Sequence, residues 1–373
     1  MVLRPTYYLA DMETGNVLET VRLHKVNIAS NLRPGKFTAE VDLRQFGSMA
    51  NGRAFVERIQ ERDYTMIPAN LSSERGPNGE QLSLPMGEWW IKDVSAKFRG
   101  NTVKIGGPEF EGYAEYVLVA QSFRGNLDPI KTLADMLRLL ATTSQNMSMS
   151  LGTPSSNARI PMDIRALSTD YHSAIRSIQE DEAAPFEWRF RTFFHQPNGV
   201  IERVTRDLEV GRPVLDRDAN GQALEITGPG LTPATLLDAE WSYDSGRNPT
   251  TIYGFGAGSG DDQVGVNPTV YTSRPRPTGQ VPKNTVVTVK DALTTSQLKR
   301  YTRAAMSRVE PTSQVFSAQV PTQRLLPSVG RSYGWFNDET WTVPASKPGD
   351  RVRIVGWSWK SGGQNYTVDL VRM

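Results

Sequence analysis

The feature that most constrains the fold is a period-two alternation of apolar and polar residues near both ends of the chain. It runs through residues 36–43 near the N-terminus and through residues 351–357 and 366–371 near the C-terminus. In a β-strand, this alternation places the apolar side chains on one face of a sheet. The pattern is typical of antiparallel sheets with one buried and one solvated face. Both ends of the chain are therefore predicted to form sheet domains.

The N-terminal sheet domain is predicted over residues 1–119 as an antiparallel barrel or sandwich. Residues 54–59 are expected to add a strand to the stretch described above. The alternating residues 89–98 are followed by a polar turn and by a return through residues 102–105. Two alternating runs around a short polar turn predict a β-hairpin.

Residues 120–238 differ from the two ends because apolar stripes with helical spacing appear there. Residues 127–142 predict a helix with Asp128 as its N-cap, and residues 170–182 predict a second helix. Residues 186–208 predict a hairpin of two strands. This segment is therefore expected to be a small α+β domain.

Residues 239–373 return to strands, with one helix inserted at residues 295–310 and a hairpin turn at residues 361–365. The predicted fold class is mainly β with an α+β insert. In this arrangement, two antiparallel β-barrel domains flank a small domain of two helices and a hairpin.

Charge balance and amino-acid composition exclude several classes of function. Lys and Arg number 42 against 40 Asp and Glu, so the net charge of +2 gives no electrostatic case for nucleic-acid binding. The absence of cysteine removes disulfides, thiol nucleophiles and cysteine metal sites. The three histidines, His24, His172 and His195, form no metal-binding motif. No signal-peptide pattern opens the chain, and no apolar run reaches the length of a membrane span.

Three polar segments resemble chemical sites, and each has a simpler interpretation. Residues 254–260 are glycine-rich, but the sequence after them predicts no helix, so we expect a loop rather than a phosphate-binding turn. The acidic pairs Asp261 with Asp262 and Asp216 with Asp218 lack the closing Glu of a calcium loop and favour ordinary turns. No Ser-His-Asp signature occurs. The sequence therefore assigns no catalytic, cofactor-binding or metal-binding residue.

The tryptophans Trp89, Trp90, Trp357 and Trp359 form two pairs. Trp357 and Trp359 share one strand face, which is compatible with a platform for stacking sugars. In a strand-rich chain, such aromatic pairs more often fill cores or subunit interfaces. Trp89 and Trp90 are adjacent and point to opposite faces, so at least one is expected outside the barrel core. We therefore predict all four as candidate interface residues.

Three stretches of the sequence match, in their order, the elements of one known family. They are residues 171–190, which end in Glu187-Trp188-Arg189, residues 247–254, and residues 298–309 with the later strands at 348–354 and 366–371. Together they resemble the central hub, or minor tail protein, of tailed bacteriophages. This baseplate-hub family is related to the spike proteins of type VI secretion systems. Within it, the sequence is most similar to hubs of siphophages that infect actinobacteria.

The resemblance implies a homotrimer in which two barrels per subunit alternate around the axis. Six similar barrels would then face a six-fold tail tube or distal tail ring. The implied partners are the distal tail ring or tail tube protein, the tape measure protein, and receptor-binding or spike proteins. The implied location is the virion tail tip, after synthesis in the host cytoplasm. Because the chain stops at Met373, directly after the last predicted strand, we expect no attached lytic enzyme.

The sequence therefore predicts a structural virion protein without enzymatic activity or a cofactor. Its expected role is a trimeric hub that connects the tail tube or distal tail ring to the host-adhesion apparatus and closes the DNA channel. A carbohydrate-binding or receptor-binding tail module is the alternative, and a glycoside hydrolase is a weaker one.

Overall fold

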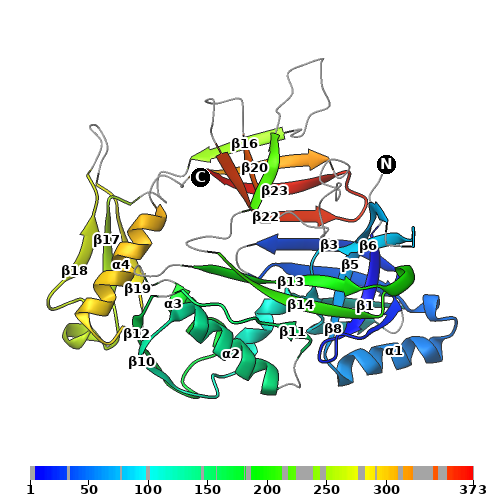
Figure 1. The fold of residues 1–373 in the computed structure, drawn as a ribbon, viewed down its shortest axis with the longest axis horizontal. Coiled ribbons are helices and arrows are strands. Elements are labelled where there is room, and N and C mark those ends of the chain that lie inside the picture. Colours follow the sequence, from blue (N-terminus) through cyan, green and yellow to red (C-terminus); the bar gives the residue numbers. More distant parts are fainter. Residues whose placement is uncertain are drawn as a thin grey trace, which may run out of the picture.

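The structure is a computed structural model in which strands predominate. In Figure 1 the larger sheets occupy the upper and right-hand parts, a small sheet lies at the left, and helices lie along the lower and left-hand margins. The structure describes residues 5–31, 34–75, 78–97, 101–143, 147–156, 158–179, 181, 186–211, 217–223, 238–243, 249–275, 282–289, 292–309, 314–321, 339–342 and 351–372.

The largest sheet has ten strands and takes them from both ends of the chain. Its order is β16-β20-β23-β22-β3-β4-β9-β8, with β21 beside β22 and β15 beside β21. All pairs are antiparallel except β15 with β21. The strands are β3 (Leu23–Asn31), β4 (Lys36–Asp42), β8 (Asp93–Lys97), β9 (Thr102–Pro108), β15 (Arg217–Ala223), β16 (Asp238–Tyr243), β20 (Gln314–Pro321), β21 (Glu339–Thr342), β22 (Arg351–Lys360) and β23 (Asn365–Arg372).

The two ends of the chain meet where β22 pairs with β3, from Gly356 opposite Asn31 to Lys360 opposite Asn27. Figure 1 shows these two strands side by side. The mainly β class and the predicted hairpins β8–β9 and β22–β23 are confirmed. The predicted pair of barrels is not confirmed, because no sheet formed by the described residues closes on itself. Alternation fixes which face of a strand is buried, but it does not specify the sheet that the strand joins.

A second sheet of five strands has the order β2-β1-β5-β6, with β7 also paired to β5. A common apolar core combines side chains of this sheet with side chains of the ten-stranded sheet, including Phe37, Trp89 and Trp357. The Trp89 and Trp357 rings meet edge to face with centroids 6.3 Å apart. The C-terminal strands thus help to fill the N-terminal core. The strands are β1 (Thr6–Asp11), β2 (Val17–Thr20), β5 (Tyr64–Arg75), β6 (Gln81–Pro85) and β7 (Trp89–Trp90).

The strand predicted at residues 54–59 is wrong, because the segment is part of helix α1 (Met49–Glu61). The Ser48 side chain caps this helix by accepting a hydrogen bond from Asn51 N at 3.1 Å. Phe55, Val56 and Ile59 are buried at helical spacing and pack into the core between the two sheets. The short 3₁₀ helix η1 (Leu43–Phe46) precedes α1.

The middle of the chain forms the predicted helices and hairpin. Helix α2 begins after Asp128, whose carboxylate accepts hydrogen bonds from Ile130 N and Lys131 N at 3.0 Å each, so the predicted N-cap is confirmed. Helices, strands and short 3₁₀ turns enclose a second apolar core. The elements are η3 (Phe110–Tyr116), β10 (Phe123–Leu127), α2 (Pro129–Thr143), β11 (Met149–Ser150), β12 (Ile160–Ile164), α3 (Tyr171–Gln179), β13 (Glu187–His195), η4 (Pro197–Gly199) and β14 (Arg203–Gly211).

Helix α4 (Thr295–Val309) packs on a three-stranded sheet of order β18-β17-β19 and confirms the helix predicted near residues 295–310. Gly254 lies at this contact, and a Cβ atom there would come within 2.2 Å of the Thr302 Oγ1 atom. Close packing of a helix on a strand therefore accounts for this glycine. The remaining elements are β17 (Thr251–Phe255), η6 (Gly260–Asp262), β18 (Val270–Ser273) and β19 (Asn284–Thr288).

Loss of a C-terminal side chain is expected to destabilise the N-terminal core. Trp357→Ala empties a buried site between the sheets and should lower the free energy of unfolding by about 3–5 kcal/mol, measured by urea denaturation. Lys360→Ala, at the exposed end of the same strand, should change it by no more than about 0.5 kcal/mol. Equal effects of the two substitutions would contradict the shared core.

Candidate functional site

The best-defined polar site lies where hairpin β13–β14 packs on the second sheet. Ala10, Ile67 and Val204 form a small buried cluster at this junction. The rings of Tyr8 and Phe194 meet beside it in an edge-to-face contact, with centroids 5.4 Å apart. Apolar contact alone allows such a hairpin to slide, so its position depends on directional polar bonds nearby.

A buried salt bridge between Glu88 and Arg206 supplies those directional bonds. Arg206 Nη2 lies 2.6 Å from Glu88 Oε1, and Arg206 Nε lies 2.9 Å from Glu88 Oε2. Both side chains are almost fully buried, at 1% and 0% exposure for Glu88 and Arg206. These two hydrogen bonds fix the orientation of the guanidinium relative to the carboxylate.

Further contacts complete the surroundings of the Arg206 guanidinium. Its Nη1 atom donates to the carbonyl oxygens of Met12, at 3.1 Å, and Met147. The guanidinium carbon also lies 4.2 Å from the centroid of the Phe110 ring, within cation–π range. The Thr192 hydroxyl donates to Glu88 Oε2 at 3.2 Å. Arg206 therefore ties together segments that are distant in the sequence.

Two more carboxylates lie at the same junction. Glu109 Oε2 accepts a hydrogen bond from Gly35 N at 2.6 Å, and Glu111 Oε1 accepts one from Phe190 N at 2.7 Å. Burial, followed by the charge of Glu111, raises the pKa of Glu109 to about 8, against the opposing effect of its hydrogen bonds and of Arg189. Burial also raises the pKa of Glu111. At neutral pH, Glu109 is therefore mainly protonated.

The buried cluster of Glu88, Glu109, Glu111, Arg189 and Arg206 supports docking of the hairpin rather than a reaction. Glu88 and Arg206 pair with each other, and the carboxyls of Glu109 and Glu111 accept hydrogen bonds from backbone N–H groups. The pairing of Glu88 with Arg206 was not predicted from the sequence, because nothing local links residues that are 118 positions apart. The one local signal was a Glu directly before two tryptophans, which places a charge inside an apolar stretch.

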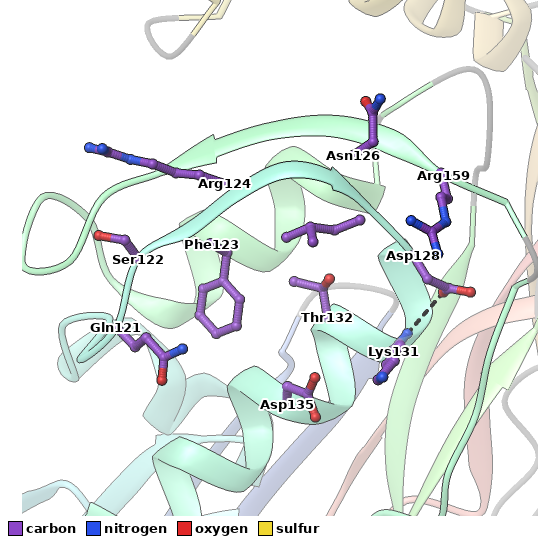
Figure 2. Close-up of a pocket in the computed structure, with 11 residues that line it drawn as sticks. Gln121, Ser122, Phe123, Arg124, Asn126, Asp128, Lys131, Thr132, Asp135 and Arg159 are labelled. Atoms are coloured by element: carbon purple, nitrogen blue, oxygen red, sulfur yellow. Dashed lines mark hydrogen bonds between the residues drawn. The ribbon is translucent and has the colours of Figure 1, made fainter.

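A second candidate site is a surface cavity of about 370 Å³ between strand β10 and the first turns of helix α2. Figure 2 shows Phe123 and Thr132 between the strand and the helix, with Lys131 and Arg159 on either side of Asp128. The lining combines backbone, hydroxyl and charged groups around one aromatic ring, a composition suited to binding a polar ligand or segment.

Both acidic side chains that line this cavity already have hydrogen-bond or ion-pair partners. Partial burial alone would raise the pKa of Asp128, but hydrogen bonds from Lys131 N and from Ser155 and Ser156 lower it to about 2. Asp135 forms an ion pair with Arg138 at 2.6 Å. Within the part of the chain that the structure describes, Lys131 and Arg159 form no ion pair. Lys131 and Arg159 are therefore the cavity-lining cations that remain available to pair with an acidic group of a ligand.

The four predicted interface tryptophans are all buried within the subunit. Trp89, Trp357 and Trp359 belong to the core between the two sheets, and Trp90 belongs to the second core. Their exposed fractions are 0% for Trp89, 8% for Trp90, 1% for Trp357 and 3% for Trp359. A sugar-stacking platform needs exposed ring faces, so that interpretation of Trp357 and Trp359 is wrong. Contact of these residues with a neighbouring subunit stays a prediction.

The acidic pairs are not brought together. Asp261 and Asp262 are exposed in turn η6, Asp218 lies in β15, and Asp216 lies outside the described residues. Over the described ranges, no three His, Cys, Asp or Glu side chains are grouped so as to hold a metal ion. His172 lies 3.6 Å from Glu115, and His195 lies 3.9 Å from Glu202. None of the helices described by the structure has the length and apolar character that a membrane crossing requires.

Removal of one partner of the buried salt bridge is expected to be strongly destabilising. Arg206→Met leaves the Glu88 carboxylate buried without its counter-ion and should lower the free energy of unfolding by about 3–5 kcal/mol in urea denaturation. Combining Glu88→Gln with Arg206→Met should recover part of the lost unfolding free energy, because the effects of substitutions at two residues in contact are coupled. Arg138→Met, which removes an exposed pair, should cost at most about 1 kcal/mol. Additive losses in the double variant would contradict the pairing.

The raised pKa of Glu109 predicts a pH-dependent stability. The folded chain binds this proton more tightly than the unfolded chain, whose pKa is near the ordinary 4.5. The contribution of Glu109 is therefore fully present below that value and is lost as the pH rises toward about 8, at up to about 1.4 kcal/mol per pH unit. Glu109→Gln should flatten the thermal-stability profile between pH 5 and about 8. The exposed control Glu57→Gln should keep the wild-type slope, and an unchanged slope in Glu109→Gln would refute the assignment.

Comparisons with known proteins identify the fold. No protein-family model and no curated protein sequence matches the chain. The tail protein from Neisseria meningitidis MC58 is similar in structure, with a TM-score of 0.55, 11% identity, and coverage of 98% of this chain and 96% of that one. The 43 kDa tail protein of prophage MuSo2 from Shewanella oneidensis gives a TM-score of 0.52 at 10% identity, with 98% of each chain covered.

A chain of the Francisella PdpA–VgrG complex is also similar, with a TM-score of 0.50 and 9% identity. The match covers 100% of this chain and 58% of that one. At these identities, the likeness establishes the fold and leaves the function to be argued separately. The chain therefore has the fold found in phage tail proteins and in part of a VgrG complex.

Proposed function

We propose that the chain is a structural protein of a phage-type tail. The observation that carries this proposal is the structural match to two tail proteins over nearly the whole length of all three chains. The shared fold extends over 98% of this chain in both matches. The tail proteins of Neisseria meningitidis and of prophage MuSo2 are named for a place in an assembly, which supports a non-enzymatic role here.

Within the tail, we assign the chain to the hub at the tail tip. In this role three subunits connect the tail tube or distal tail ring to the host-adhesion apparatus and close the DNA channel. The tape measure protein and the receptor-binding or spike proteins complete the set of proposed partners. The sequence resemblance supports the hub, the trimer, the two barrels in each subunit and an actinobacterial siphophage as the source.

Exposed apolar side chains offer contacts for such an assembly. Tyr271 and Val286 lie on either side of Tyr253 across the sheet β18-β17-β19, in register with it. Their exposed fractions are 60% for Tyr271 and 57% for Val286. Apolar side chains that face water in a row are typical of protein–protein contacts. We therefore propose a subunit or partner contact on this face, in addition to the predicted contacts of the tryptophans.

A map of the assembled particle tests the hub. We expect three copies of the chain on the tail axis, next to the tube or distal ring, in a cryo-electron microscopy reconstruction. One, five or six copies would refute the trimer, and a position at the end of a fibre would favour the receptor-binding module. A glycan array with the purified protein separates that alternative further, because a hub should show no saturable sugar binding.

A further inference from the structure

Strand β10 has an unpaired edge beside the surface cavity. Over Phe123–Leu127 it pairs with Ile160–Ile164 of β12, which is its one strand neighbour among the described residues. In an antiparallel pair, alternate residues direct their N–H and C=O groups away from the partner strand. Arg124, Gly125 and Asn126 are all exposed, and in Gly125 the exposed atoms belong to the backbone. The edge is therefore open to another chain.

The protein covers a comparable edge elsewhere. Strand β6 is an edge strand of the second sheet. The Gln196 side-chain amide accepts from Ser83 N and donates to Ser83 O, both at 2.9 Å, and so occupies the backbone groups of β6. Open edges recruit other strands, and proteins commonly block them in ways of this kind. In the described part of the chain, no side chain blocks β10 in that manner.

Strand β10 contains a glycine, Gly125, in an unusual backbone conformation. Its φ angle of +101° is a conformation that other residues rarely adopt, while a Cβ atom there would meet nothing within 4 Å. The glycine is thus required by the backbone conformation and not by crowding within the subunit. A glycine inside a strand often marks a bend or a close approach of another backbone.

The charge around this edge favours an acidic occupant. Lys131 and Arg159 line the cavity and form no ion pair with any described residue, while Arg124 is paired across the strands with Asp163 at 3.0 Å. The N-terminus of α2 is already capped by Asp128. That terminus is therefore not left open to an anion, and Lys131 and Arg159 are the cavity-lining groups that acidic side chains of an extended segment can contact.

We propose that an extended acidic segment of a partner protein binds here by adding a strand to the open edge of β10. Its backbone pairs with β10, and its acidic side chains contact Lys131 and Arg159 at the cavity of about 370 Å³. Backbone hydrogen bonds supply affinity in this mode of recognition, and side-chain pockets supply specificity. This docking site goes beyond the proposed tail function and does not depend on it.

Selection from a peptide library tests the proposal on the full chain. Because the sequence contains no cysteine, Glu57→Cys on α1 gives a single thiol for immobilisation away from β10. An mRNA-displayed library of random heptapeptides is then selected against the protein. We expect enrichment of strand-forming sequences that carry Asp or Glu. No enrichment of acidic sequences overturns the proposal.

The best heptapeptide then separates strand addition from simple charge attraction. In fluorescence polarisation, Lys131→Glu with Arg159→Glu should weaken binding at least tenfold. The matched control, Arg53→Glu with Arg62→Glu at exposed positions of α1 and its C-cap, should change binding less than twofold. N-methylation of alternate peptide amides should abolish binding when it lies on the pairing edge and leave it intact on the other edge. Binding that tolerates methylation on both edges of the peptide overturns the proposal, and so does binding that survives the charge reversal at the cavity. The methylation test changes only the peptide, so it remains decisive if a protein variant fails to fold.

Discussion

The buried salt bridge between Glu88 and Arg206 is the interaction on which the arrangement of the subunit depends. Both groups leave water on folding, and the resulting penalty is offset only when their geometry and their remaining hydrogen bonds are satisfied together. That condition is met at one placement of hairpin β13–β14, where the carbonyl of Met12 and the hydroxyl of Thr192 also reach the pair. The bridge therefore selects a single docked position among the many that apolar contact would allow.

The segment that carries Glu88 connects this junction to the rest of the molecule. Trp89 directly follows it and packs against Phe37 and Trp357 in the first core. Trp90 points the other way, where its ring lies 5.4 Å from that of Tyr113 in the second core. Three consecutive residues thus face a salt bridge and two separate cores. A shift of this segment would disturb all three sites together.

Local features were predictable from the sequence, and long-range features were not. The capped stripe after Asp128 and the alternation around residues 93–108 depend on neighbours in the chain, so the helix and the hairpin follow from them. Helix α1 was missed because its buried apolar residues, considered without Gly52 and the polar residues around them, resemble a short strand. The Glu88 bridge and the pairing of β22 with β3 depend on residues far apart in sequence, for which one sequence carries no signal.

The pairing of β3 with β22 also determines when the fold can be completed during synthesis. Residues 23–31 leave the ribosome long before residues 356–360, so β3 initially lacks the strand that will occupy its outer edge. The early core likewise lacks Trp357 and Trp359. Contacts of such high sequence separation slow folding and expose unpaired strands in the meantime. Until the C-terminal third has been made, the nascent chain therefore lacks the partner of this β3 edge and part of its first core.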